Sequence, residues 1–224
     1  MRWIVAFFIF LSVHLFANES EPLFVSLGRN CHPALYLRDC GLRKAAYPFD
    51  WLITLDFKGF IKILDDDFAF FVTDEYLIPD PLTQMVVVND YYHIYFAHEG
   101  PFGDTWDEER FSQQVLGIKD KFVRRINRFR ELREYRGKVF FLCEFWSEPC
   151  VGAEVNENSN YALALRDALD RYFPALDYTL VIISYTDLNI PALLSIERVV
   201  EYQMDRSNQH VQQMFDSLLN AALD

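Results

Sequence analysis

The pattern of apolar and polar positions begins with a strand followed by a helix. An apolar run from Leu23 to Leu27 ends at Gly28, which predicts a short strand. Pro33 falls just inside a helical stretch that extends to about Leu42, where proline is tolerated because first-turn amides have no acceptor within the helix. A second helical region is predicted over residues 57–71.

Residues 85–98 carry the clearest local pattern. Two β-rich runs flank Asn89-Asp90, which is typical of a hairpin with a two-residue turn. Strand alternation then predicts that His98 lies on the apolar face of the second strand, together with Tyr92, Ile94 and Phe96. The same alternation predicts that His93 lies on the opposite face.

Helices and strands alternate in the rest of the chain. An apolar stripe at helical spacing predicts a helix over residues 107–135, in one piece or in two that meet near Gly117; the stripe is Ile118, Phe122, Ile126, Phe129 and Leu132. The remaining elements are predicted as strands over residues 138–145, 178–184 and 194–202 and helices over 158–172 and 207–222. This alternation predicts an α/β fold, a mixed sheet with βαβ alternation in the C-terminal half. No repeat or linker divides residues 18–224, so we expect a single domain.

The first residues have the pattern of an export signal. Arg2 supplies one positive charge, an apolar run extends from Ile4 to Phe16, and Ala17 precedes a polar segment. Residues 1–17 are therefore interpreted as a signal peptide, which predicts a periplasmic, cell-surface or secreted protein that meets the membrane only through this segment. The run is shorter than the roughly 20 residues of a membrane span. A buried helix or an uncleaved anchor is the alternative.

Charge and cysteine content narrow the function classes. The net charge of −12 argues against a nucleic-acid partner. Cys31 and Cys40 in one helix would lie roughly 13 Å apart along its axis, too far for a disulfide. Geometry leaves Cys143–Cys150 open as a local pair. No cysteine or histidine spacing fits zinc, and we expect neither a metal nor another cofactor.

Cys31 is the leading candidate for chemistry. It follows a predicted strand and a Gly-Arg-Asn turn, at the start of a helix. Unpaired amides and the helix dipole at that position favour a thiolate, the nucleophilic form, and Arg29 acts in the same direction. The alternative is a small buried apolar residue, which is the commonest role of a free cysteine.

A cysteine nucleophile needs a base, and His98 is the preferred candidate. It ends a predicted strand on the apolar face, where it could lean into a cleft beside a helix terminus. His32 is set aside because neighbours in a helix do not face each other. His210 is expected to be exposed on the last helix. The alternative for His98 is a histidine at the edge of the core that bonds to a backbone carbonyl.

The helix over residues 119–133 is strongly basic. Arg124, Arg125 and Arg128 could bind an anion. A solvated face opposite the apolar stripe is the alternative, and we favour it because no Gly-rich phosphate loop precedes the helix.

Several segments together resemble a bacterial family named "Putative papain-like cysteine peptidase (DUF1796)". The matching segments lie within residues 23–185 and are Ser26-Leu27-Gly28-Arg29-Asn30-Cys31, Pro48-Phe49-Asp50-Trp51, Phe96-Ala97-His98, residues 121–129 and Val139-Phe140-Phe141. The resemblance implies a papain-like cysteine-hydrolase arrangement with Cys31 as nucleophile and His98 as base. In that family the histidine is often followed by Asp, whereas Glu99 follows it here.

The third catalytic group stays open among Asp104, Glu144 and Asn156. Asp50 is a further catalytic candidate, although Phe49-Asp50-Trp51 more readily fixes a loop against the core. We therefore expect a cysteine hydrolase, either a peptidase or amidase or an acyl transferase, acting on a peptide or amide. Substrate contacts are expected from Arg29, Asn30, Arg124, Arg125 and Arg128. The alternatives are a transferase or binding protein for an anionic sugar or nucleotide, which would use the basic helix, and a non-catalytic exported interaction protein.

Overall fold

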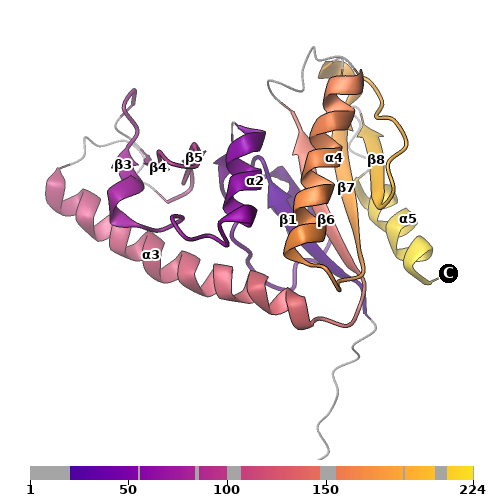
Figure 1. The fold of residues 1–224 in the computed structure, drawn as a ribbon, viewed down its shortest axis with the longest axis horizontal. Helices are drawn as coiled ribbons and strands as arrows, with labels where there is room; N and C mark the ends of the chain where they lie inside the picture. The colour runs from indigo at the N-terminus through magenta and orange to yellow at the C-terminus, as the bar shows by residue number, and fades with distance from the viewer. Residues whose placement is uncertain are drawn as a thin grey trace, which may run out of the picture.

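A computed structural model describes residues 21–54, 56–83, 86–99, 107–146, 155–188, 190–204 and 211–223. Its centre is a four-stranded parallel sheet in the order β1-β6-β7-β8, formed by β1 Leu23–Gly28, β6 Val139–Phe145, β7 Tyr178–Tyr185 and β8 Val199–Met204 (Figure 1). All seven residues of β6 are buried. Parallel strands covered on both faces have such continuous apolar runs, which is why β6 and β7 were recognisable in the sequence.

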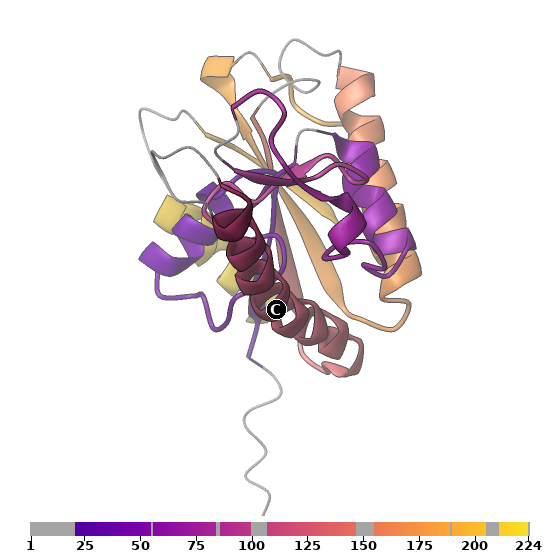
Figure 2. The same cartoon turned by 90° about the vertical axis from the view of Figure 1, so that its left-hand side faces the viewer.

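Helices cover both faces of this sheet (Figure 2). α1 His32–Asp39 and α5 Val211–Leu223 pack on one face, through a cluster that includes Leu37, Phe140, Leu142, Phe215 and Leu218. α2 Phe57–Asp65, α3 Glu108–Glu131 and α4 Val155–Tyr172 pack on the other face. The expected α/β class is therefore confirmed.

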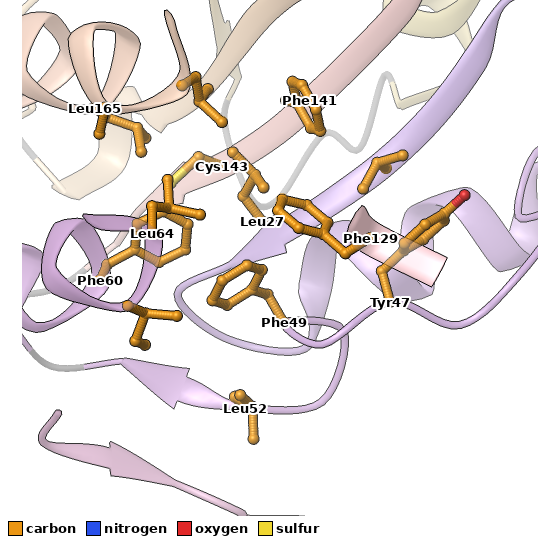
Figure 3. Close-up of a cluster of buried hydrophobic side chains, with 14 of the residues drawn as sticks. Leu27, Tyr47, Phe49, Leu52, Phe60, Leu64, Phe129, Phe141, Cys143 and Leu165 are labelled. Carbon is orange, nitrogen blue, oxygen red and sulfur yellow. The ribbon is translucent and has the colours of Figure 1, made fainter. Parts of the chain in front are cut away.

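Phe49 is central to the larger of the two clusters. Its ring centroid lies 4.5 Å from that of Phe60 in α2 and 5.6 Å from that of Phe129 in α3. Figure 3 shows this ring beside Leu27 of β1 as well, so the loop after α1 is packed against the sheet and two of its helices.

A second, antiparallel sheet lies between α1 and α3 in the chain. Its order is β2-β5-β4-β3, with β2 Ile53–Thr54, β3 Leu77–Pro79, β4 Val87–Asn89 and β5 Ile94–Tyr95. Figure 1 shows β3, β4 and β5 above one end of α3, away from the parallel sheet. Three short 3-10 helices complete the described elements, η1 Asp74–Tyr76, η2 Leu132–Glu134 and η3 Thr186–Leu188.

The predicted elements are present with shifted ends. The first helix stops at Asp39, two residues before Gly41, whose φ is 70°. The helix predicted over residues 57–71 ends at Asp65 because Asp67 and Phe68 have positive φ values of 47° and 63°. The long helix continues through Gly117 without a break. The last strand begins at Val199 rather than at residue 194.

The predicted two-residue hairpin turn is wrong. β4 ends at Asn89 and β5 begins at Ile94, so four residues form the turn. The Asn89 side chain explains the longer turn, because its Oδ1 accepts the Tyr92 amide at 2.9 Å and its Nδ2 donates to the Phe70 carbonyl at 2.7 Å. Since β5 stops at Tyr95, strand alternation does not reach His98, which lies exposed in a turn.

The predicted signal peptide lies outside the described residues, so export and the boundary at residue 18 stay predictions. In the part of the chain that the structure describes, no helix combines the length and apolar character that a membrane crossing requires.

Candidate functional site

The candidate site lies where the strands of the parallel sheet end. Ligands of open α/β sheets bind outside the carboxyl ends of the strands. The turn from Gly28 to Cys31 leaves β1 at this edge, and the register pairs Gly28 with Cys143 of β6. Glu144 is the next residue of β6, and Tyr185 is the last residue of β7. Residues distant in sequence therefore meet at one edge.

Gly28 allows this turn to pack tightly. Its φ is 72°, and a Cβ built on it would lie 2.4 Å from the Phe49 carbonyl oxygen. Such a contact is closer than any side chain tolerates, so only glycine fits. Two of the segments that carried the family resemblance, residues 26–31 and 48–51, are therefore in direct contact.

Arg29 ties the same turn to the second sheet. The Thr54 amide in β2 donates to the Arg29 carbonyl at 3.0 Å. The Arg29 guanidinium turns into the core, 4.0 Å above the Phe57 ring, and the residue is 1% exposed. The cation above the aromatic ring holds the turn in place from within the core. A substrate contact from Arg29 stays a prediction.

Cys31 occupies the position before the first turn of α1, but the expected thiolate is not favoured there. Partial burial raises the pKa of the Cys31 thiol above its ordinary 9.0. A hydrogen bond from the backbone amide of Cys31 lowers this pKa, and the nearby Glu144 carboxylate raises it further. The net pKa shift is upward, so burial and the carboxylate outweigh this hydrogen bond.

His32, which the sequence set aside, has a buried carboxylate as its partner. Its Nδ1 lies 3.1 Å from Oε1 of Glu144, which is fully buried in β6. The Tyr185 hydroxyl donates to the same carboxylate oxygen, and it lies 2.8 Å from the Tyr36 hydroxyl. The His32 side chain is 43% exposed, so the imidazole joins a buried network to solvent beside Cys31.

Asn30 fixes the start of α1. Its Oδ1 accepts the His32 amide at 2.8 Å, and its Nδ2 lies 3.2 Å from His32 Nδ1. Because Pro33 has no N–H, the first turn offers fewer free amides than expected from a helix terminus. The amide of Cys31 lies within hydrogen-bond reach of its own sulfur.

His98 lies three residues after the end of β5. Its ring centroid is 5.5 Å from that of Trp51, in an edge-on arrangement. Trp51 precedes β2, which bonds to Arg29, and β2 pairs with β5 through Ile53 and Tyr95. His98 was chosen because strand alternation predicted that it lies on the apolar face, and β5 ends before it. The pairing of Cys31 with His98 stays a prediction.

Asp50 makes contacts that suit the structural role, and a catalytic role for it stays a prediction. It is buried, it accepts Arg43 Nε at 3.0 Å and it accepts the Tyr47 amide at 3.2 Å. Burial raises the pKa of Asp50, and the Arg43 guanidinium partly offsets this shift. Both partners flank the Phe49 loop, so the carboxylate fixes that loop against the core.

Of the other candidates for a third group, Asn156 is exposed on α4 and Asp104 lies outside the described residues. Glu144 is the candidate that a histidine contacts.

The basic helix α3 mainly serves packing. Arg125 is buried, and burial lowers the pKa of its guanidinium against the opposing effects of Asp50 and Glu99. Arg128 donates to the Ala46 carbonyl. Arg124 is exposed and remains available to a ligand. Of these three arginines, Arg124 fits the interpretation as a solvated face, and anion binding by this helix stays a prediction.

The structure contains no disulfide between Cys31 and Cys40, as helix geometry predicted. Cys31 and Cys40 lie at opposite ends of α1 and are both free thiols. Cys143 is buried in β6, whereas Cys150 lies outside the described residues, so their pairing stays open. Among the residues the structure covers, no group of three metal-binding side chains comes together.

A pocket of about 480 Å³ opens over the second sheet, with Asp56, Asp80, Asp90 and His93 in its lining. Neither Cys31 nor His32 lines it. The candidate nucleophile therefore lies outside this pocket, at the strand ends.

One signal in the sequence could have identified Glu144. In β6, Phe140 and Leu142 face α1 and α5, while Phe141 and Cys143 face the other helices. The same alternation assigns Glu144 to the face of Phe140 and Leu142. A carboxylate at an apolar strand position is buried only with partners, and this marks a functional candidate.

Comparison with known proteins identifies the family of this chain. The family "Putative papain-like cysteine peptidase (DUF1796)" matches residues 22–187. A relative, "Uncharacterized protein R408" of Acanthamoeba polyphaga mimivirus, is 27% identical over 142 residues, which cover 55% of this chain and 62% of that protein. No solved structure matches the chain. Since the family match spans most of the sequence and includes Cys31, the chain belongs to the family described as "Putative papain-like cysteine peptidase (DUF1796)".

Proposed function

We propose that this protein is a thiol-dependent hydrolase of peptide or amide bonds, with Cys31 as nucleophile and His32 as base. The observation that carries the proposal is the contact between His32 Nδ1 and buried Glu144, directly after Cys31 at the strand ends. A nucleophile, a base and a third group that orients the base are the parts that such chemistry needs. The family description supports the same chemistry at a coarser level.

In the proposed reaction, the Cys31 sulfur attacks the substrate carbonyl carbon, and the thiol proton passes to His32 Nε2. The carbonyl oxygen takes up the negative charge and accepts a hydrogen bond from the Cys31 amide. When the C–N bond breaks, His32 returns the proton to the leaving amine. Water then attacks the acyl carbon and gives a proton to His32. The C–S bond breaks, His32 returns that proton to the Cys31 sulfur, and the acid product leaves.

The resting state in this proposal has a neutral Cys31 thiol. The raised pKa of Cys31 disfavours a thiolate before substrate binds. Proton transfer then accompanies attack, so the rate depends strongly on the base. A papain-like pair that ionises in advance would instead have a lowered thiol pKa.

His98 is the competing base, and it rests on the family motif Phe96-Ala97-His98. Trp51 packs edge-on against its ring at 5.5 Å. His32 is preferred because Glu144 fixes its Nδ1, whereas the described contact of His98 is aromatic. The same proposal includes a peptide or amide substrate, an acyl-transfer variant of the reaction and an exported compartment. The chain covers only 62% of the relative's length.

The test is acyl-enzyme formation with p-nitrophenyl acetate, followed by hydrolysis of a fluorogenic peptide library. We expect a burst of nitrophenol and a single acetyl adduct on Cys31 by peptide mapping. Cys31→Ala should abolish both. Cys40→Ala is the matched control, because it removes the other free thiol of α1. An adduct on Cys40 or none on Cys31, or peptide hydrolysis that survives Cys31→Ala, would overturn the proposal.

A further inference from the structure

Arg125 is a buried cation of α3 with an unsatisfied nitrogen. The residue is 9% exposed, and its Nη1 has no hydrogen-bond partner among the described residues. The guanidinium carbon lies 4.8 Å from the centroid of the Phe122 ring, which is an aromatic contact. Buried charges are normally paired, because taking a charge out of water is costly. Arg125 therefore carries a desolvation cost that the described residues do not fully offset.

The neighbouring arginines of α3 have oxygen partners. Arg128 donates to the Ala46 carbonyl, and Arg130 lies 3.1 Å from the Asp67 carboxylate. Of these three arginines, the most deeply buried is the one with an unsatisfied nitrogen. An apolar side chain of similar size would pack at position 125 without the cost of burying a charge. Packing alone does not account for an arginine there.

The two carboxylates that act on Arg125 are bonded by other cations. Asp50 accepts a hydrogen bond from Arg43 Nε at 3.0 Å, and Glu99, which is 8% exposed, accepts one from Lys121. Burial lowers the pKa of Arg125, and both carboxylates oppose this effect. Each carboxylate already balances the charge of another side chain, so neither is left to balance Arg125.

Positive charge is in excess around Arg125. Arg43 and Arg128 lower the pKa of Arg125 further, as like charges do. The side chains that interact here are called the Arg125 cluster, and they are the cations Arg43, Lys121, Arg125 and Arg128 and the carboxylates Asp50 and Glu99. Within this cluster, four cations and two carboxylates leave an excess of two positive charges. A dianion would balance this excess.

The Arg125 cluster reaches the surface beside His98. The side chains of Arg43 and Lys121 are 22% and 39% exposed. The guanidinium carbon of Arg43 lies 5.5 Å from the centroid of the Trp51 ring, which packs edge-on against the His98 ring. Solvent therefore reaches the cluster at Arg43 and Lys121.

We propose that the Arg125 cluster is a binding site for a phosphate dianion, either inorganic phosphate or the phosphate group of a monoester. The planar guanidinium of Arg125 can donate parallel N–H bonds to two phosphate oxygens, and Arg43 and Lys121 supply further donors from the exposed side. A carboxylate carries a single charge and would neutralise the excess only in part. The site uses neither Cys31 nor His32, so it goes beyond the proposed hydrolase and is independent of it.

Thermal unfolding of the full chain tests phosphate binding, because a ligand that binds the folded state raises Tm as its concentration rises. The probes are sodium phosphate, sodium acetate and sodium chloride at neutral pH and matched ionic strength. We expect phosphate to raise Tm along a saturable curve that gives its Kd, and acetate to cause a smaller rise above the chloride reference. Phosphate also stabilises proteins through exclusion from their surface, but that general effect does not saturate.

Arg125→Met removes the central cation and keeps a long apolar side chain. The Kd for phosphate should rise by at least about tenfold, as expected for the loss of hydrogen bonds to a charged group. Tm without phosphate should equal or exceed that of the wild type, because the substitution removes a buried charge. Arg110→Met is the matched control, since it removes the same charge from an exposed position of α3, roughly 22 Å away along the helix axis. The Kd of this control should match that of the wild type.

If Arg125→Met does not fold, Lys121→Met carries the test. Without Lys121, Glu99 is free to pair with Arg125, so phosphate binding should weaken in this variant as well. The absence of a saturable phosphate effect in the wild type, or equal Kd values in Arg125→Met and Arg110→Met, would overturn the proposal. A lower Tm in Arg125→Met with unchanged phosphate binding would also overturn it, and would assign Arg125 to stability.

Phenyl phosphate, used as a further probe, distinguishes the two sources of the phosphate group. A lower Kd for phenyl phosphate than for inorganic phosphate would support the site and identify a monoester as its ligand. The reverse order would support the site and identify the free ion. These measurements involve no hydrolysis, so their failure would count against the phosphate site alone.

Discussion

His32 Nδ1 lies 3.1 Å from Glu144 Oε1, although the two residues are 112 positions apart in the chain. The contact joins the first residue of α1 to the sixth residue of β6, beside Cys31. It depends on parallel pairing of β1 with β6, since Gly28 is opposite Cys143 in that register. The topology of the parallel sheet therefore brings the parts of the candidate site together.

Glu144→Gln should lower the pKa of the Cys31 thiol. A carboxylate near a thiolate repels it, and removal of this charge favours ionisation. The pH midpoint of iodoacetamide modification at Cys31 should therefore shift downward. Glu201→Gln is the control, because Glu201 accepts Ser184 Oγ at 2.6 Å on β8 and is not among the groups that shift the pKa of Cys31. An unchanged midpoint in Glu144→Gln would show that the carboxylate does not act on Cys31.

Gly28→Ala should destabilise the protein more than Gly41→Ala. Both glycines have positive φ, 72° and 70°, so both substitutions cost about 1–2 kcal/mol for the left-handed backbone. A Cβ at Gly28 would also lie 2.4 Å from the Phe49 carbonyl oxygen, whereas nothing lies within 4 Å at Gly41. Urea unfolding of both variants gives the difference, which is the cost of the collision. Equal losses of unfolding free energy would contradict the tight packing of the Cys31 turn on Phe49.

Asp67→Asn should reduce stability at neutral pH but not in acid. Partial burial would raise the pKa of Asp67, but hydrogen bonds from Tyr172 and Arg130 and the charge of Arg133 outweigh it and lower this pKa below 3.8. A lowered pKa in the folded state gives stability that is present above pH 3.8 and lost as the pH falls through the folded value.

Asparagine is a suitable replacement because it tolerates the positive φ of 47° at this position. The difference in unfolding free energy between wild type and Asp67→Asn should be largest at pH 7 and shrink at about pH 3. A difference that is constant with pH would mean that the charge of Asp67 contributes nothing.

Much of the fold was predictable because its signals are local. The apolar run of β6 and the stripe from Ile118 to Leu132 on α3 determine burial through spacing alone, and both predictions are confirmed. The hairpin prediction was wrong because Asn89 uses its side chain to bond Tyr92 and Phe70, which adds two residues to the turn. Such a side-chain contact depends on tertiary structure.

The candidate site was only partly predictable. The position of Cys31 after a strand and before a helix was readable from the turn and from Pro33. The partner of His32 was not readable from the sequence. Nothing local indicates that β1 pairs with β6, and this pairing is what brings Glu144 close to the turn. The expectation of a lowered thiol pKa failed for the same reason, since Glu144 and partial burial are long-range effects.

The central claim is that His32, rather than His98, serves Cys31 as its base. The most direct measurement is the rate of the p-nitrophenyl acetate burst in His32→Gln and His98→Gln, with the site of acylation mapped in each. Loss of a general base costs about 10²–10⁴-fold. We predict a loss in this range for His32→Gln, with Cys31 still present as a free thiol, and a burst close to wild type for His98→Gln. A large loss in His98→Gln together with an intact burst in His32→Gln would contradict the claim and identify His98 as the base.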